Sequence, residues 1–507
     1  MDDQRKALLC SSSSLRSVED RKTAIASALG AKDETLRPYL APLWLLLLPR
    51  PPSEISLNAL RVAYGQSLTQ VLQMASNASA GSFDVVLDVA IAYEDEQIFR
   101  YSKIQRLLGL MYRLICVICT ENSIDLQYDN DVDVRLIIFH RGLTNQHQPA
   151  RPKAFQRLQP FGDLQTLAGS DRAWQRLCSL ESEPAESLLQ DFLRIRGGSS
   201  DETMSSNQIE IERLPGGLSI HQSSPQNAFQ EISSGCHCSI AVGGTFDHLH
   251  VGHKLLLTMT ALVLDPRSIR GACLTIGITG DELLKNKNFR EELEDFPERQ
   301  LAVQEFLLGI LGLFSLSHVL DNLRHVESNS PHGREVHNTL KSGLIIKYVE
   351  IFDPCGPTIT DETITALVLS AETKGGGQVV NDKRGEKGWS ALEVFEVDVL
   401  EAGEADGDSR DRADDKFQGK ISSTDIRRRI HEKSATKFDR SSGDSKQLPS
   451  LHSAAMWGCC RETTACPINE RLQQAIHVQL LGLIKKSQAC QDLMSWEAGK
   501  CYNNPGS

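Results

Sequence analysis

The sequence lacks an apolar run long enough to cross a bilayer. Its most apolar stretch, LAPLWLLLLP at residues 40–49, has about half the length of a membrane-spanning helix. The first residues, MDDQRKALLCSSSS, contain no hydrophobic core of a signal peptide, and their two early aspartates are unfavourable in a mitochondrial presequence. We therefore expect a cytoplasmic protein without a membrane partner, in which WLLLLP is a buried strand.

An excess of positive charge is also missing. The 507 residues include 54 lysines and arginines against 66 aspartates and glutamates, which gives a formal net charge of -12. This sign disfavours general binding to nucleic acid or to anionic lipid, because both attract clustered positive charge. We expect no nucleic-acid partner, although a local basic pocket for a small phosphorylated molecule is compatible with the composition.

The thirteen cysteines do not form the framework of a small disulfide-rich domain. Their number is odd, and without a secretion signal they are expected to be reduced thiols. Cys116 and Cys119 form a CxxC inside the apolar run LICVIC, where core packing is favoured over metal binding. The cysteines near residues 236 and 460 lack the spacing of zinc ligands, so no metal ligand is predicted.

Composition divides the chain into four segments. Residues 1–195 are expected to form an α/β accessory domain of unknown role. Residues 196–235, rich in Gly, Ser, Asn and Gln, are expected to be a flexible linker. Residues 236–432 alternate strand and helix patterns, and residues 433–507 form a partly helical tail.

The first segment contains apolar runs typical of strands at 44–49, 83–92 and 132–140. Apolar residues at helical spacing predict helices over 57–75 and 102–118. The segment carries no chemical motif that we identify.

The third segment predicts a Rossmann-like parallel sheet with helices on both faces. Expected strands lie at 238–244, 272–279, 343–352, 364–370 and 392–400, and an expected helix at 297–314. The acidic stretch at 401–415 is predicted to be a disordered surface insertion. In the tail, residues 469–486 show a helical pattern.

Glycine and histidine concentrate in SIAVGGTFDHLHVGH, residues 239–253. An apolar strand that ends in Gly243 and Gly244 and leads into a helix is an arrangement that binds ligands at the carboxyl edge of a parallel sheet. His250 and His253 are spaced i, i+3, so at a helix start they point to the same side, where helix amides favour an anion. A zinc site that includes His248, or a structural role for all three histidines, are the weaker alternatives.

Two distant stretches carry a resemblance to a known family. GTFDHLHVGH resembles the (T/H)xGH signature of the nucleotidyltransferase superfamily, and ISSTDIRRRI at 421–430 resembles its (I)SS(S/T)xxR signature. The intervening GITGDELLKNK, PERQ and DPCGP…SAETKGGGQVVNDKR are similar to eukaryotic, fungal-type phosphopantetheine adenylyltransferase. The resemblance covers roughly residues 238–432.

The resemblance implies transfer of AMP from ATP to 4'-phosphopantetheine, giving dephospho-CoA and pyrophosphate, with Mg²⁺ on the polyphosphate as the expected cofactor. It places His250 and His253 on the ATP phosphates as catalytic groups, with Lys285 or Lys287 at the reacting phosphates. The ligand-binding residues that it implies are Gly243, Gly244, Thr245, Phe246, Arg299, Gly376, Asn381, Arg384, Ser422, Ser423, Thr424 and Arg427.

For several of these residues, a structural or solvent-exposed role without a ligand stays open. The lysines and Arg299 are also compatible with a solvated surface, and Ser422 to Thr424 with an ordinary helix cap. The triple glycine before Asn381 is compatible with a surface turn.

Other functions are weighed against this one. A phosphocholine or phosphoethanolamine cytidylyltransferase shares similar end motifs, but the sequence has no long basic amphipathic helix. An aminoacyl-tRNA synthetase would need a KMSKS-like loop, and a non-catalytic scaffold would not need intact motif histidines. The GxxxxGK[ST] motif of a fused dephospho-CoA kinase is absent, so one activity is expected. Protein partners from the coenzyme A pathway would bind through the N-terminal region.

Overall fold

The computed structural model describes residues 41–79, 85–93, 101–124, 126, 132–141, 162–170, 172–197, 209–216, 237–264, 271–311, 333–340, 343–398 and 422–443. Both sheets of the described chain belong to one compact unit. The predicted acidic insertion at 401–415 and the predicted helix at 469–486 lie outside the described residues.

The N-terminal sheet is entirely parallel, with strand order β3-β2-β1-β4-β5. Its strands are β1 Leu43–Leu48, β2 Val85–Tyr93, β3 Val132–His140, β4 Arg176–Leu180 and β5 Glu210–Leu214. Strands buried on both faces read as continuous apolar runs, which is why LWLLLL forms the central strand. The N-terminal half is therefore a complete layered α/β unit.

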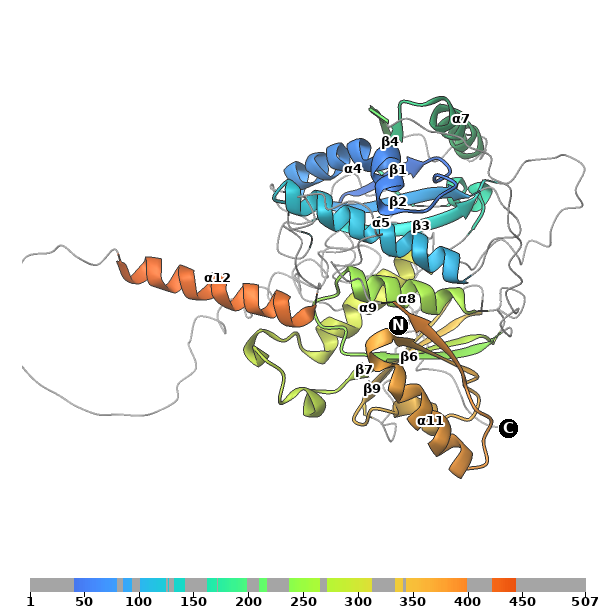
Figure 1. The fold of residues 1–507 in the computed structure, drawn as a ribbon, viewed down its shortest axis with the longest axis vertical. Coiled ribbons are helices and arrows are strands. Elements are labelled where there is room, and N and C mark those ends of the chain that lie inside the picture. The colour runs from blue at the N-terminus through green and yellow to red at the C-terminus, as the bar shows by residue number, and fades with distance from the viewer. Residues whose placement is uncertain are drawn as a thin grey trace, which may run out of the picture. The chain divides into compact units, whose positions relative to one another are not determined.

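Helices cover both faces of this sheet (Figure 1). Alternating residues of each strand point to opposite faces, so Leu46 and Leu48 pack under α4 and α5, whereas Leu45 and Leu47 pack under α6 and α7. These helices are α4 Leu57–Ser79, α5 Tyr101–Glu121, α6 Leu164–Ala168 and α7 Glu183–Gly197.

The C-terminal sheet has six strands in the order β11-β10-β6-β7-β9-β8. They are β6 Ser239–Gly244, β7 Cys273–Thr279, β8 Glu335–Thr339, β9 Ile345–Ile351, β10 Ala366–Ser370 and β11 Glu393–Val397. All neighbours are parallel except β8, which pairs antiparallel with β9 and ends the sheet at that edge. The expected Rossmann-like α/β fold is confirmed, with this one antiparallel strand added.

The helices of the second half also form two layers. Ile240 and Val242 of β6 belong to the same apolar cluster as α8 Val251–Leu262 and α9 Phe296–Leu311, whereas Ala241 packs with α11 Lys374–Glu386. Short 3-10 helices lie in the connections, namely η5 Asp281–Leu284, η6 Arg290–Glu292, η7 Gly356–Ile359 and η8 Ala371–Thr373. A long helix, α12 Ser423–Gly443, follows the second sheet (Figure 1).

Two expectations need correction. The linker predicted over 196–235 contains β5, which pairs with β4 and completes the first sheet. Its residues EIERL are mostly polar because β5 is an edge strand, and this hid the strand among polar neighbours. The triple glycine at 375–377 lies in the first turn of α11 rather than in a loop or turn.

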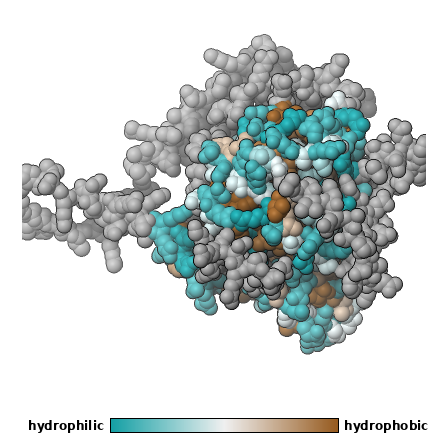
Figure 2. Space-filling view, turned by 45° about the horizontal axis from the view of Figure 1, so that its top comes forward, coloured by the Kyte–Doolittle hydropathy of each residue, from teal (hydrophilic) through white to brown (hydrophobic). Residues whose placement is uncertain are grey.

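None of the described helices is long and apolar enough to span a membrane. On the face in Figure 2 the described surface is largely hydrophilic, and its hydrophobic atoms lie in separate small patches.

Candidate functional site

The connection from β6 to α8 is an unusually tight loop. Phe246 and His248 both have positive φ angles, of 52° and 46°, a region that side-chain-bearing residues adopt rarely. Phe246 is fully buried, and a Cβ on Gly244 would lie 3.0 Å from its ring. A side chain at 244 would crowd this buried ring, which favours glycine at that position.

His250 and His253 form a stacked pair at the start of α8. His250 is the N-cap residue, and its Nδ1 accepts a hydrogen bond of 3.2 Å from the amide of Gly252. The two imidazole rings lie 3.9 Å apart between centroids and 21° from parallel. The expectation that both rings point to one side of the helix start is confirmed.

His253 is held in its neutral form. Burial disfavours the charged ring, and together with the nearby His248 it lowers the pKa of His253 to about 3. Its Nδ1 is buried and has no hydrogen-bond partner among the described residues. A neutral imidazole at a helix N-terminus can donate one hydrogen bond to an anion.

The first turn of α12 is joined to this loop from far along the chain. Arg427 is buried and forms an ion pair with the equally buried carboxylate of Asp247. Ser423 Oγ donates to the Asp247 carbonyl at 2.9 Å, and Arg427 Nε donates to the Asn288 carbonyl at 3.0 Å. The two signature stretches, about 170 residues apart, therefore meet in the folded protein.

The other residues of the ISST stretch are tied within α12. Ser422 Oγ donates to Asp425 Oδ2 at 2.8 Å and accepts from the Asp425 amide, so Ser422 caps the helix. Thr424 Oγ1 accepts from Arg427 at 3.2 Å. The ISST stretch thus has two roles: Ser422 caps α12, and Ser423 contacts the β6–α8 loop.

The loop that precedes α9 makes hydrogen bonds to the β6–α8 loop. The amide of His248 donates to Glu294 Oε2 at 2.6 Å, and the amide of Glu294 donates to Asp247 Oδ1 at 3.0 Å. Arg299 is fully buried and donates to the carbonyls of Thr245 and Thr279 at 2.9 and 2.7 Å. Arg299 therefore braces the loop backbone instead of lying on a solvated helix surface.

Sequence reasoning missed the roles of Asp247 and Glu294. Asp247 contacts both α12 and the loop before α9, so it joins three segments. A signal was available, since an aspartate between a phenylalanine and a histidine in a buried-looking motif needs a cationic partner.

Lys285 and Lys287 lie on the surface after β7. Both are exposed, and Lys285 forms an ion pair with Glu282 one turn earlier. Exposed lysines on a loop at the carboxyl edge of the sheet can reach toward a ligand, and their predicted contact with phosphate stays a prediction.

The structure separates Asn381 and Arg384 from the histidine loop. Asn381 exchanges hydrogen bonds with the backbone of Leu392, just before β11. Arg384 is buried and donates to the carbonyls of Thr358 and Ile364, the latter just before β10. In a parallel sheet these strand starts lie at the edge opposite the β6–α8 loop, so this placement does not support a nucleotide contact.

Gly376 also shows no sign of a close ligand approach. A Cβ built there meets nothing within 4 Å, and so does one on Gly375, whereas one on Gly377 would crowd Leu369 and Val394. Of these three glycines, Gly377 alone would crowd neighbouring side chains if it carried a Cβ.

No group of three or more His, Cys, Asp or Glu residues in the described chain could hold a metal ion. His248 Nε2 donates a hydrogen bond of 2.7 Å to the Glu292 carbonyl, so this nitrogen is already bound within the protein.

Comparison with known proteins places the chain in a family. Residues 33–220 match a Domain of unknown function (DUF8446). Phosphopantetheine adenylyltransferase of Pyrobaculum aerophilum is 30% identical over 165 residues, which are 32% of this chain and 82% of that protein. The chain belongs to the phosphopantetheine adenylyltransferase family.

Two yeast relatives are more similar but longer than the shared region. Phosphopantetheine adenylyltransferase of Saccharomyces cerevisiae is 36% identical over 188 residues, 37% of this chain and 47% of that protein. An uncharacterized protein of Schizosaccharomyces pombe is 37% identical over 160 residues, 32% of this chain and 39% of that protein. The chain therefore spans less than half the length of these two relatives.

Proposed function

We propose that the chain transfers the adenylyl group of ATP to 4'-phosphopantetheine, forming dephospho-CoA and pyrophosphate. The proposal rests on a stacked histidine pair at the start of α8, in which His253 is neutral and which the buried Asp247–Arg427 pair holds against the first turn of α12. Family membership supplies the substrates, because the relatives carry that activity in their names.

The reaction needs no protein nucleophile. A phosphate oxygen of phosphopantetheine attacks the α-phosphorus of ATP in line, the new P–O bond forms, and the bond to the β-phosphate oxygen breaks to release pyrophosphate. Negative charge spreads over the phosphoryl oxygens during this exchange. The protein then accelerates the step by positioning and by electrostatic stabilisation.

His250 and His253 have the chemistry for that stabilisation. A neutral imidazole can donate a hydrogen bond to a phosphoryl oxygen. The positive end of the α8 dipole adds to their effect, because charge near a helix N-terminus favours an anion. A bound phosphate would in turn raise the pKa of His253 from its low value.

Arg427, one of the ligand-binding residues that the resemblance implies, is already paired within the protein. The charge of Arg427 is paired with Asp247, and its three nitrogen atoms contact described residues. We therefore assign Arg427 to holding the loop and the α12 amides in place. Lys285 and Lys287, which are exposed, are the side chains proposed to contact the reacting phosphates.

Mg²⁺ is proposed to arrive on the ATP polyphosphate. Asp247 is the carboxylate nearest in sequence to the histidine pair, and it is already bound by Arg427 and by the amide of Glu294. The described residues thus supply no carboxylate ligand set for the ion. The ion would help neutralise the phosphates, and no step above depends on a protein–metal bond.

Pyrophosphate release by the purified full chain tests the proposal. ATP with 4'-phosphopantetheine should give steady turnover, whereas CTP with phosphocholine or phosphoethanolamine should give none above background. Turnover with the cytidine pair would make the chain a cytidylyltransferase, and turnover with neither pair would leave a non-catalytic scaffold. Cytoplasmic location and coenzyme A pathway partners stay predictions.

A further inference from the structure

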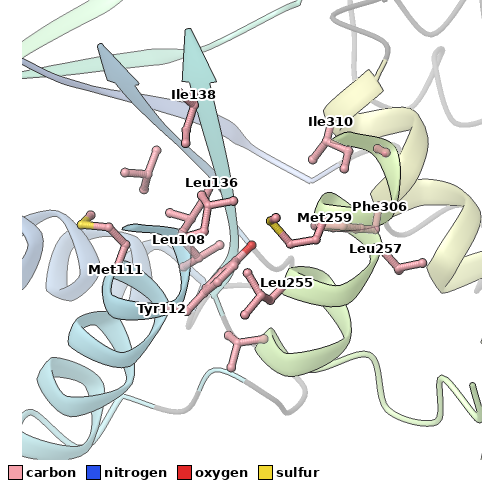
Figure 3. Close-up of a cluster of buried hydrophobic side chains, with 14 of the residues drawn as sticks. Leu108, Met111, Tyr112, Leu136, Ile138, Leu255, Leu257, Met259, Phe306 and Ile310 are labelled. Atoms are coloured by element: carbon pink, nitrogen blue, oxygen red, sulfur yellow. The ribbon is translucent and has the colours of Figure 1, made fainter. Parts of the chain in front are cut away.

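Helix α8 lies between the C-terminal sheet and helix α5 of the N-terminal half. Helix α5 packs on α8, and strand β3 packs on α9. Figure 3 shows apolar side chains of α5 and β3 facing those of α8 and α9, and the labelled ones include Leu108, Met111, Tyr112, Leu136, Leu255, Met259 and Phe306. Residues 254–261 are all buried, whereas Gly252 and His253 are partly exposed. The histidine turn is thus the open start of an otherwise enclosed helix.

A buried ion pair fixes α8 at the next residue. Lys254 is buried, and its Nζ donates to Asp133 Oδ1 of β3 at 2.5 Å and to the Val134 carbonyl at 3.2 Å. Arg135 also binds the Asp133 carboxylate, at 2.8 and 2.9 Å. Burial opposes ionisation of Asp133, but the two cations outweigh it and hold the pKa of its carboxyl well below the usual range.

Helix α9 is attached to the same sheet by a second set of charges. Arg172 pairs with the fully buried Asp88 at 3.1 Å and donates to the Gly309 carbonyl of α9 at 2.5 Å. A Cβ on Gly309 would lie 2.2 Å from Arg135 Nη1, so this helix position is open to the guanidinium because it is glycine. Through Arg299, α9 also braces the loop that precedes the histidines.

We propose that Asp133 and Lys254 are positioning residues for the adenylyl transfer, through which the N-terminal sheet sets the place of the histidine pair. This inference rests on the proposed function. The Lys254 amide donates to the His250 carbonyl at 3.0 Å, and Lys254 directly follows His253, so the ion pair and both rings share one helical turn. A displacement of about 1 Å at reacting groups can cost on the order of a hundredfold in rate.

The Asp133–Lys254 ion pair supports a positioning role, because apolar contacts alone could hold β3 and α8 together. Apolar side chains of similar volume stabilise a buried interface as well as an ion pair does, or better. The surrounding contacts between α5 and α8 are apolar and already stabilise the interface. An ion pair adds direction, because the ammonium must stay at the carboxylate and cannot slide along the interface.

Lys254→Met is the main test, because it removes the charge and leaves Asp133 paired with Arg135. In the full chain, kcat with ATP and phosphopantetheine should fall by roughly tenfold to a hundredfold, while KM for ATP stays close to the wild-type value. Asp133→Asn should act similarly, and the double variant should fall no further than the single ones. Lys254→Arg keeps the charge and should retain most of kcat.

Met111→Ala is the matched control, since it weakens the same α5–α8 interface without touching the charges. It should lower the midpoint of thermal unfolding and leave kcat unchanged below that transition. The imidazole NMR resonances of His250 and His253, recorded without substrates, should shift in Lys254→Met and stay in place in Met111→Ala.

Wild-type kcat in folded Lys254→Met, or an equal loss of kcat in Met111→Ala, overturns the positioning role, as do unchanged imidazole resonances. The two proposals fail separately. A wild-type chain with no adenylyl transfer, whose histidine resonances still shift in Lys254→Met, would overturn the function and leave the positioning intact.

Discussion

β1 and β6 hold corresponding places in their two sheets. Each is the first strand of its sheet in the chain, lies inside a parallel arrangement, and leads into a helix that covers one face. The connections differ completely in chemistry. Residues 49–56, PRPPSEIS, contain no glycine and no histidine, whereas residues 243–250, GGTFDHLH, provide the glycines, the strained loop and the first histidine of the stacked pair.

This difference teaches where the function of such a fold resides. Similar layered sheets can bury similar cores, but a ligand site needs particular groups at the carboxyl edge. In this chain the C-terminal sheet has these groups, and the buried charges of the N-terminal sheet that we describe are directed at α8 and α9. One sheet forms the proposed site, and the other is proposed to hold it in position.

The largest stability effect should come from breaking the buried pair that joins the two motifs. Arg427→Met leaves the Asp247 carboxylate buried without its cation, which should lower the free energy of unfolding by about 3–5 kcal/mol. Chemical denaturation measures the change. Arg61→Met removes the exposed pair with Glu121 in the N-terminal half and should cost no more than about 1 kcal/mol. Equal losses in both variants would contradict the distinction between the buried pair that joins the two motifs and an exposed pair outside the site.

A smaller, pH-dependent effect is expected where the two regions meet. Burial raises the pKa of Glu305 on α9 to about 8, although Arg135 lowers it and Asp133 raises it. In the unfolded chain a glutamate titrates near pH ~4.3. The folded protein therefore keeps a proton that the unfolded chain loses, and this contribution to stability is lost as the pH rises from about 4.3 to about 8.

Glu305→Gln should remove that slope. Relative to wild type, the variant should gain stability from pH 5 to pH 9, by at most about 1.4 kcal/mol for each pH unit below the folded pKa. Urea unfolding at the two pH values measures the difference. Glu386→Gln, on the exposed end of α11, should show no such gain. A constant difference between Glu305→Gln and wild type would exclude a buried, protonated carboxyl.

The smallest expected effect on stability is a difference between alanine substitutions at two neighbouring glycines of α11. Gly376→Ala should raise the free energy of unfolding by roughly 0.5–1 kcal/mol, because it fills open space in a helix. Gly377→Ala should not, since its Cβ would lie 3.1 Å from Leu369. Turnover should stay at the wild-type level in Gly376→Ala. A large loss of turnover in Gly376→Ala would instead support the ligand contact that the sequence resemblance implied.

Much of the fold could be predicted because the strands are apolar and buried on both faces. LWLLLL and SIAVGG were recognisable for that reason, and helices α4, α5 and α9 showed apolar residues at helical spacing. The polar edge strand β5 and the glycine-rich start of α11 could not be recognised in this way. Their structure depends on neighbours, the pairing with β4 and the packing of Gly377, more than on local pattern.

The candidate site divides in the same way. The i, i+3 spacing predicted that His250 and His253 share one side, since helix geometry alone determines it. The partners of Arg299, Arg384 and Asn381 could not be predicted. A buried arginine and an exposed one look alike in sequence, and the carbonyls that they bind come from distant segments.

The central claim is that the stacked histidines stabilise charge on a phosphoryl group, and pyrophosphate release by His253→Ala tests it most directly. Turnover with ATP and 4'-phosphopantetheine should fall by roughly two to three orders of magnitude, the usual loss for one donor to a charged transition state. His337→Ala, which removes a histidine paired with Glu335 on the edge strand β8, should keep wild-type turnover. Near-normal turnover in a folded His253→Ala variant would contradict the account.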